Sequence, residues 1–134
     1  MNPVNSPGQA DRPRLTVTTV NIDAPDANEL ALFYVRLLGW EVAVAEPDWV
    51  MLRGEGAGVG LSFQTEPHYI RPVWPGRADT QQMMLHLEIM VDDLATGVEH
   101  AIACGATLAQ YQPQDDVRVC LDPAGHPFCL WILT

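Results

Sequence analysis

The chain has 134 residues, of which 48% are hydrophobic and 18% are charged, a balance that is typical of a folded domain and not of a disordered chain. Seventeen Asp and Glu against seven Lys and Arg give a formal net charge of −10. Nucleic acid and anionic membrane surfaces would repel such a chain, so we expect neither as a partner. No apolar run has the length of a membrane span, and the polar start lacks a signal-peptide core. The three cysteines have no CxxC spacing, which predicts reduced thiols. We therefore expect a cytoplasmic protein.

The first half of the chain has the pattern of a strand, a helix and three strands. Residues 1–13 are polar and lack apolar periodicity, so they are predicted to be a flexible leader to a single domain over residues 14–134. Residues 15–22 alternate as a strand does. A helix is predicted between the N-cap Asp26 and Gly39, because apolar residues follow Asp26 at helical spacing. Three short strands are predicted to follow, at residues 40–45, 49–53 and 59–64.

The same order of elements repeats in the second half, after a linker or lid at residues 66–81 that holds three prolines and two aromatic residues. A strand is predicted at residues 84–91, and a helix between the N-cap Asp93 and Gly105. Three further strands are predicted, at residues 106–111, 117–122 and 127–133. The period of about 67 residues is too long for a solenoid and indicates duplication of a half-domain. The two copies are module one, residues 14–65, and module two, residues 82–134.

Strand parity divides the first and last strands of each module into two faces. The apolar face is predicted to pack beneath the helices and consists of Val20, Ile22, Leu61, Phe63, Leu85, Leu87, Ile89, Phe128, Leu130 and Ile132. The other face is predicted to line a cup shared by the two modules and consists of Thr19, Asn21, Ser62, Gln64, His86, Glu88, Cys129 and Trp131.

Three segments, FYVRLLGWEV, HLEIMVDDL and DPAGHPFCLW, resemble the vicinal oxygen chelate superfamily, which contains glyoxalases, bleomycin-resistance proteins and dioxygenases, and DPAGHPFCL with LGWEV looks like its glyoxalase-like subgroup. The resemblance covers residues 15–134. It implies an α+β fold in which two tandem βαβββ modules form a curved mixed sheet around a central cup, with the helices packed outside. It also implies a homodimer. The reaction stays open, because the superfamily holds lyases, isomerases, dioxygenases, transferases and drug-sequestering proteins.

The metal site that the resemblance implies is mostly missing. The superfamily holds its metal with His or Gln on the first strand of each module and Glu on the last, and the matching positions are Thr19, Ser62, His86 and Cys129. Only His86 fits, so we expect no metal and no other cofactor. Zinc could take His86 and Cys129, but a third ligand, Glu88, would need to reorient.

His86, Glu88 and Cys129 are the candidate catalytic residues if the protein is an enzyme. The resemblance places His86 and Cys129 within a few ångströms of each other, where they could form a thiolate nucleophile, and Glu88 could act as a general base. The ordinary alternative is a buried apolar Cys129, a hydrogen-bonding His86 and a structurally paired Glu88, and we favour it because these roles are the commoner ones.

Two functions are therefore weighed. The favoured one is metal-independent binding of a small hydrophobic or aromatic metabolite in the cup, as in bleomycin-resistance proteins, because flat rings and a few polar groups suit such a ligand. The residues predicted to contact it are Thr19, Asn21, Trp49, Ser62, Gln64, Tyr69, Trp74, His86, Cys129 and Trp131. The alternative is a metal-independent isomerase, cyclase or lyase that uses His86, Glu88 and Cys129. A metal-dependent glyoxalase or dioxygenase is the least favoured.

Overall fold

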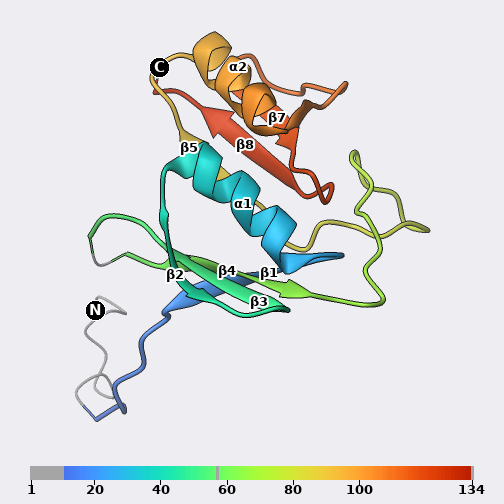
Figure 1. Cartoon of the computed structure of the whole chain (residues 1–134). Coiled ribbons are helices and arrows are strands. Elements are labelled where there is room, and N and C mark those ends of the chain that lie inside the picture. The colour runs from blue at the N-terminus through green and yellow to red at the C-terminus, as the bar shows by residue number, and fades with distance from the viewer. Residues whose placement is uncertain (1–10, 57, 134) are drawn as a thin grey trace.

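The computed structural model describes residues 11–56 and 58–133 and contains two modules with the same order of elements (Figure 1). Module one comprises β1 (Thr19–Ala24), α1 (Ala27–Leu38), β2 (Glu41–Ala45), β3 (Trp49–Arg53) and β4 (Gly60–Thr65). Module two comprises β5 (Leu87–Met90), α2 (Leu94–Cys104), β6 (Thr107–Leu108), β7 (Val117–Leu121) and β8 (Pro127–Trp131). The predicted α+β fold of tandem βαβββ modules is confirmed. Residues 1–10 of the predicted leader lie outside the described residues.

Each module forms a four-stranded mixed sheet of its own. The strand orders are β1-β4-β3-β2 and β5-β8-β7-β6, with β1 parallel to β4, β5 parallel to β8, and antiparallel pairing elsewhere. The predicted curved sheet is thus two sheets, and β1 and β5 each lie at one edge of their sheet. These two edges position the candidate site.

The helices begin and end where the sequence predicts. The side chain of Asp26 accepts hydrogen bonds from the backbone N–H groups of Asn28 and Glu29, and that of Asp93 accepts one from the N–H of Thr96. These carboxylates satisfy N–H groups that have no partner within the helix. Neither helix among the described residues is long and apolar enough to cross a membrane.

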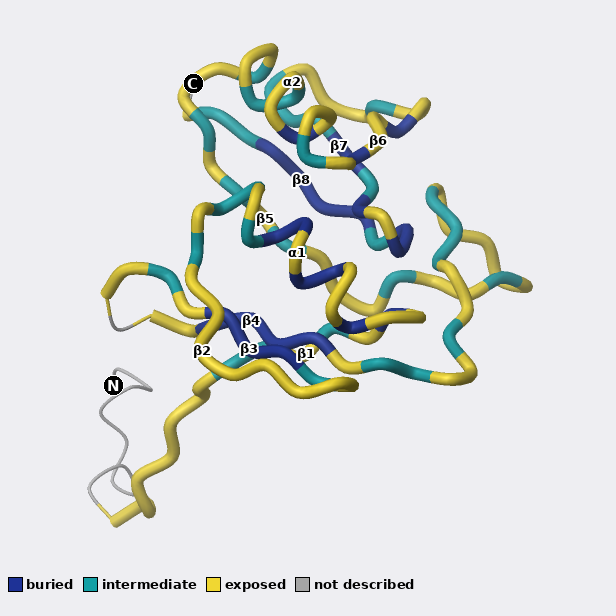
Figure 2. The backbone as a smooth tube through the Cα atoms, in the orientation of Figure 1, coloured by how far each residue is buried: buried dark blue, intermediate teal, exposed yellow. Residues whose placement is uncertain are grey.

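One apolar core lies between the helices and the two sheets (Figure 2). Phe33 and Tyr34 of α1 form its centre, because both rings contact the Phe128 ring of β8, at centroid distances of 6.0 and 6.4 Å, and Tyr34 also stacks on Phe63 of β4 at 5.4 Å. Phe63 and Phe128 belong to the predicted apolar face, and both are fully buried. Helix α1 therefore packs against both modules.

Several strands are shorter than predicted or shifted, and four of them, β1, β5, β6 and β8, differ by two residues or more. The first begins at Thr19 instead of residue 15, and β6 is reduced to two residues. Strand β5 begins only at Leu87, so Leu85 is 65% exposed and does not join the core as predicted. The register explains this difference, because in the described part of the chain β5 pairs with β8 only from Leu87 onward, and Leu85 lies before that pairing. Ile132, likewise predicted for the core, follows the end of β8 and is half-buried.

A buried hydrogen bond joins the two modules. The hydroxyl of Tyr34 in α1 donates to Oδ2 of Asp122 at 2.7 Å, and Asp122, at the end of β7, is 1% exposed. The second oxygen of Asp122 accepts from the backbone N–H groups of Ala124 and His126. The carboxyl group therefore holds the β7–β8 turn and attaches it to α1.

Replacing Tyr34 by Phe should lower the free energy of unfolding by about 1–3 kcal/mol, because a buried carboxyl group then loses one of its donors. Urea denaturation measures the change. Tyr111→Phe is the matched control, since Tyr111 is 53% exposed, and its effect should stay within about 0.5 kcal/mol. Equal effects of the two substitutions would show that the Tyr34–Asp122 bond does not hold the modules together.

Candidate functional site

A cavity of about 420 Å³ lies between the modules, where β1 faces the chain that leads into β5, and the linker forms part of its wall. Apolar side chains from both modules and the linker line it, namely Val20, Ile22, Ile70, Met84, Leu85 and Leu87. Polar side chains also line it, namely Asn21, Asp23, Tyr34, Glu66, His68, Tyr69, Gln81, Gln82, His86 and His126. An apolar cavity of this size with a few polar groups is typical of a small-molecule site.

The cavity includes only some of the predicted ligand-contacting residues. Asn21, Tyr69 and His86 line it. The others lie outside its wall, namely Thr19, Trp49, Ser62, Gln64, Trp74, Cys129 and Trp131. The reason is the separation of the sheets, because the cavity opens between two sheet edges and not over one continuous face.

In module one, the predicted cup residues form a hydrogen-bonded cluster around Asn21. Ser62 lies opposite Asn21 in the parallel register of β1 and β4, and its hydroxyl donates to Asn21 Oδ1 at 2.9 Å. The indole N–H of Trp49 donates to the same oxygen at 3.0 Å. The Thr19 hydroxyl instead contacts the neighbouring Val20 carbonyl oxygen, at 3.4 Å. Asn21 thus orients Trp49 and satisfies the fully buried Ser62.

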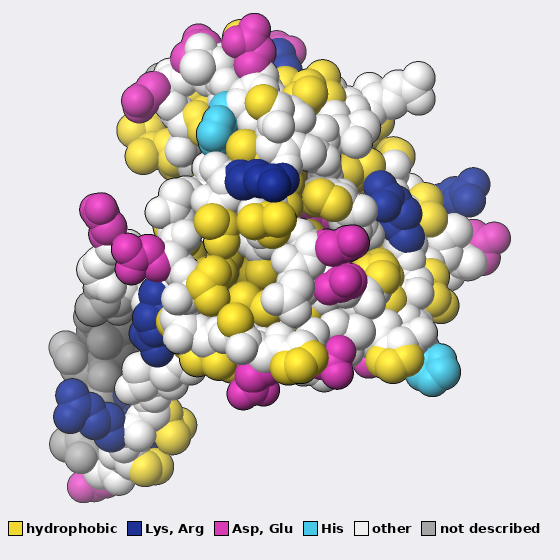
Figure 3. Space-filling view, viewed as in Figure 1, with side chains coloured by type: hydrophobic (Ala, Val, Ile, Leu, Met, Phe, Trp, Pro, Cys, Tyr) yellow, Lys and Arg dark blue, Asp and Glu magenta, His cyan; other side chains and the backbone are white. Residues whose placement is uncertain are grey.

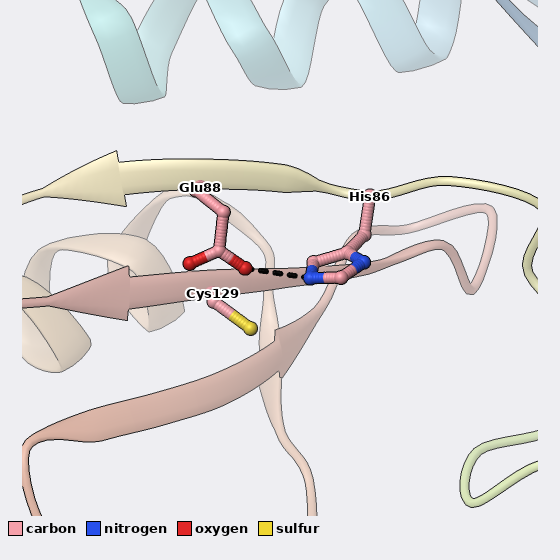
Figure 4. Close-up of side chains that lie close together, drawn as sticks. All are labelled: His86, Glu88 and Cys129. Carbon is pink, nitrogen blue, oxygen red and sulfur yellow. Dashed lines mark hydrogen bonds and ion pairs between the residues drawn. The ribbon is translucent and has the colours of Figure 1, made fainter.

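In module two, His86, Glu88 and Cys129 lie together (Figure 4). Glu88 lies opposite Cys129 in the register of β5 and β8, and His86 precedes β5 on the same face. Nε2 of His86 is 2.6 Å from Oε2 of Glu88, and one potential ligand atom from each of the three residues lies within 4.8 Å of the other two. The His86 and Glu88 side chains are 32% and 52% exposed, so the pair is open to solvent.

The Cys129 thiol is not activated by these neighbours. Burial, and after it the charge of Glu88 and the hydrogen bond that the thiol donates to Glu88, raise the pKa of Cys129 to about 12. Reactive cysteines have lowered pKa values and cationic neighbours, and Cys129 has an anionic one. At neutral pH it is a protonated thiol, which weighs against its use as a nucleophile.

The metal of the vicinal oxygen chelate superfamily does not fit the residues at its four matching positions. Ser62 is fully buried and donates its hydroxyl to Asn21, and Cys129 is a protonated thiol. His86, Glu88 and Cys129 are the one cluster of candidate ligands that the described residues contain. In this arrangement the carboxylate of Glu88 already binds His86, so a cation would have to displace that bond and the thiol proton.

His126 is a cavity residue that the sequence did not identify. Its Nε2–H donates to the carbonyl oxygen of Asp23 in β1 at 2.7 Å and lies 3.1 Å from the hydroxyl of Tyr69, which itself donates to the carbonyl oxygen of Ala124 at 2.7 Å. These bonds connect β1, the linker and the start of β8. No local pattern reveals them, because Asp23 and His126 are 103 residues apart and the acceptor is a backbone atom.

The two aromatic residues of the linker have different positions. Tyr69 lines the cavity, whereas Trp74 packs on the other face of the module-two sheet against the buried residues Ala109, Val119 and Cys129. The Trp74 indole nitrogen is buried and has no hydrogen-bond partner among the described residues. Trp74 therefore covers the apolar surface around Cys129 at the cost of an unsatisfied donor.

Replacing Trp74 by Ala should expose Cys129 and raise its rate of reaction with a disulfide reagent such as dithiobis-nitrobenzoate by about tenfold, because access limits a buried thiol. The measurement uses the Cys104→Ser background, since Cys104 is partly exposed and Cys120 is fully buried. Trp49→Ala, in module one, is the matched control and should leave the rate unchanged. An unchanged rate in Trp74→Ala would mean that Trp74 does not cover Cys129.

Comparison with known proteins identifies one family. A family model described as a glyoxalase-like domain matches residues 19–131, which spans both modules. A search of curated proteins finds no match.

Solved structures of the same fold share little sequence with this chain. A glyoxalase/bleomycin resistance protein/dioxygenase family enzyme from Burkholderia phytofirmans PsJN has a TM-score of 0.67 at 20% identity, over 90% of this chain and 100% of that chain. A glyoxalase-related enzyme from Fulvimarina pelagi has a TM-score of 0.63 at 18% identity, over 90% and 89%. Lactoylglutathione lyase from Agrobacterium tumefaciens has a TM-score of 0.57 at 15% identity, over 90% and 96%. At these identities the likeness concerns the fold alone.

Proposed function

The chain belongs to the glyoxalase-like domain family of the vicinal oxygen chelate superfamily, and we propose that it binds a small, largely apolar or aromatic metabolite between its two modules without the superfamily's metal. The observation that carries this proposal is the apolar cavity of about 420 Å³ at the edges of β1 and β5. Its volume falls within the range of about 300–1,000 Å³ that holds a metabolite-sized molecule.

The polar groups of the cavity support oriented binding. Asn21 and His86 approach from the facing edges of the two modules, and Tyr69 and His126 lie at the end of the cavity near the β7–β8 turn. Tyr69 and His126 are fixed by hydrogen bonds to backbone carbonyl oxygens. Fixed polar groups among apolar walls select a ligand by orientation while the walls supply most of the binding free energy.

Catalysis by His86 and Glu88 is the second candidate function, and their 2.6 Å contact is the observation that favours it. A histidine and a carboxylate in such contact form an acid–base pair, and His86 also lines the cavity. The same contact serves binding equally well, because it orients the imidazole. The raised pKa of Cys129 leaves the pair without a ready nucleophile.

Binding of the neutral fluorescent probe phenyl-naphthylamine tests the proposal. The wild-type chain should bind the probe with the same dissociation constant in the presence and absence of EDTA. Met84→Ser should weaken binding by about fivefold, since it removes roughly 1 kcal/mol of apolar contact. Cys129→Ala should not change the affinity, because Cys129 lies outside the cavity wall.

Met90→Ser is the matched control for Met84→Ser. Met90 is also exposed, at 56%, but lies at the far end of β5 and does not line the cavity. Equal weakening by the two substitutions would place the probe elsewhere and refute the cavity as the site. Loss of binding in EDTA would refute a metal-independent function.

We also propose that the protein is a cytoplasmic homodimer. The three free thiols support a reducing compartment. Hydrophobic side chains gather on one face between α1 and β2 (Figure 3), and the exposed apolar residues of these elements are Leu32, Val42 and Val44. Exposed apolar patches of this kind are typical of protein interfaces.

Replacing Val42 by Glu should convert the dimer to a monomer, because a carboxylate at the centre of an apolar interface remains unpaired. Light scattering coupled to gel filtration measures the mass. Leu108→Glu is the control, as Leu108 is similarly exposed but lies on β6 of module two. A monomeric wild-type chain, or a dimer that survives in Val42→Glu, would contradict the proposed assembly.

A further inference from the structure

The wall of the cavity carries two carboxylates, and the basic side chains that line it among the described residues are the histidines His68, His86 and His126. Asp23, near the end of β1, and Glu66, directly after β4, both line the cavity, and no Lys or Arg is among its lining residues. The ion pair found in the described part of the chain joins His86 to Glu88, so it involves neither Asp23 nor Glu66. The Glu66 carboxylate accepts a hydrogen bond from the backbone N–H of His68, which leaves its charge in place.

The pKa values of the two tyrosines that line the cavity are raised, chiefly by burial, and nearby carboxylates add to the shift. Burial and the charge of Asp122 raise the pKa of Tyr69 to about 12, and the charge of Asp23 contributes in the same direction. The pKa of Tyr34 is also raised, again by burial and by Asp122. A raised tyrosine pKa means that a further negative charge is disfavoured at that hydroxyl. Of the carboxylates that raise the pKa of Tyr69, Asp23 also lines the cavity, so its charge acts on the part of the wall that Tyr69 forms.

Arg71 follows the cavity residue Ile70 in the chain but does not itself line the cavity. Arg71 lowers the pKa of Tyr69 slightly, but its Nη1 donates to the carbonyl oxygen of Pro123 at 3.2 Å. Its side chain packs directly over Gly125, where a Cβ would collide with it. Arg71 therefore lies against the β7–β8 turn and is not available to an anion in the cavity.

We propose that the cavity takes amphiphilic organic cations, that is, molecules with a protonated amine at one end and an apolar, preferably aromatic, body. Asp23 and Glu66 attract the amine within apolar walls that concentrate the field, and the Tyr69 ring offers a face for cation–π contact. The apolar side chains hold the body of the ligand. The same charges repel carboxylates and phosphates. This inference rests on the proposed binding function and names the ligand class for that site.

Three probes that share one apolar body test the inference, namely phenylbutylamine, phenylbutanol and phenylbutyrate, which differ in the charge of the end group. Dissociation constants are measured by isothermal titration calorimetry on the full chain at about pH 8, where ordinary imidazoles are mostly uncharged. The amine should bind about tenfold more tightly than the alcohol, and the carboxylate most weakly. Added salt should reduce the preference, because the attracting carboxylates are partly exposed.

Asp23→Asn and Glu66→Gln locate the attraction. Each keeps the size of the side chain and an acceptor oxygen, so the alcohol should bind as it does to the wild type while the preference for the amine falls severalfold. Glu99→Gln is the control, because Glu99 is exposed on α2 and does not line the cavity.

An alcohol that binds as tightly as the amine would overturn the charge preference and leave the proposed binding function intact. A preference that survives both amide variants would overturn the assignment to Asp23 and Glu66. Failure of all three probes would overturn the inference and the binding function together.

Discussion

The buried carboxyl group of Asp122 is the constraint on which the rest of the structure depends. It accepts hydrogen bonds from the Tyr34 hydroxyl and from the backbone N–H groups of Ala124 and His126. Burial raises its pKa although each of these bonds acts in the opposite direction, so desolvation is the largest effect on this group. A buried carboxyl group tolerates few arrangements, because every lost donor leaves an unsatisfied acceptor. Asp122 therefore fixes both the β7–β8 turn and the position of α1 over module two.

The cavity follows from that attachment. The turn that Asp122 holds presents the carbonyl oxygen of Ala124 to Tyr69 and directs His126 toward the backbone of Asp23. These two bonds connect the linker and β1 to module two, although β1 and β5 belong to different sheets. The space left between the two sheet edges becomes the cavity. Its walls thus combine residues from both faces of β1, which a cup on one continuous sheet face would not do.

The sequence predicts the features that depend on local patterns. The predictions of both helix N-caps, Asp26 and Asp93, are confirmed, and so is the burial predicted for the Phe63 and Phe128 rings. Capping chemistry and strand parity are properties of short segments, so the sequence reveals them. The prediction for Leu85 is wrong, because parity does not say where a strand loses its partner. The position of Trp74 against Cys129 and the bond between His126 and Asp23 were not predictable. Both depend on contacts between distant segments and on the path of an irregular linker.

The duplicated modules show how one backbone geometry can support two different chemistries. Asn21 and Ser62 occupy the same register position in module one as Glu88 and Cys129 do in module two. The neutral amide of Asn21 accepts two hydrogen bonds and forms a closed structural cluster. The carboxylate of Glu88 instead binds the exposed His86, and it adds to the effect of burial that keeps the neighbouring thiol protonated. At this strand position module one has the amide of Asn21 and module two has the carboxylate of Glu88. This one difference gives module one a closed structural cluster and module two an open His86–Glu88 pair at the edge of the cavity. The two carboxylates of the cavity wall, Asp23 of β1 and Glu66 directly after β4, lie on the module-one side, so the proposed charge preference depends on module one while the apolar wall comes from both modules.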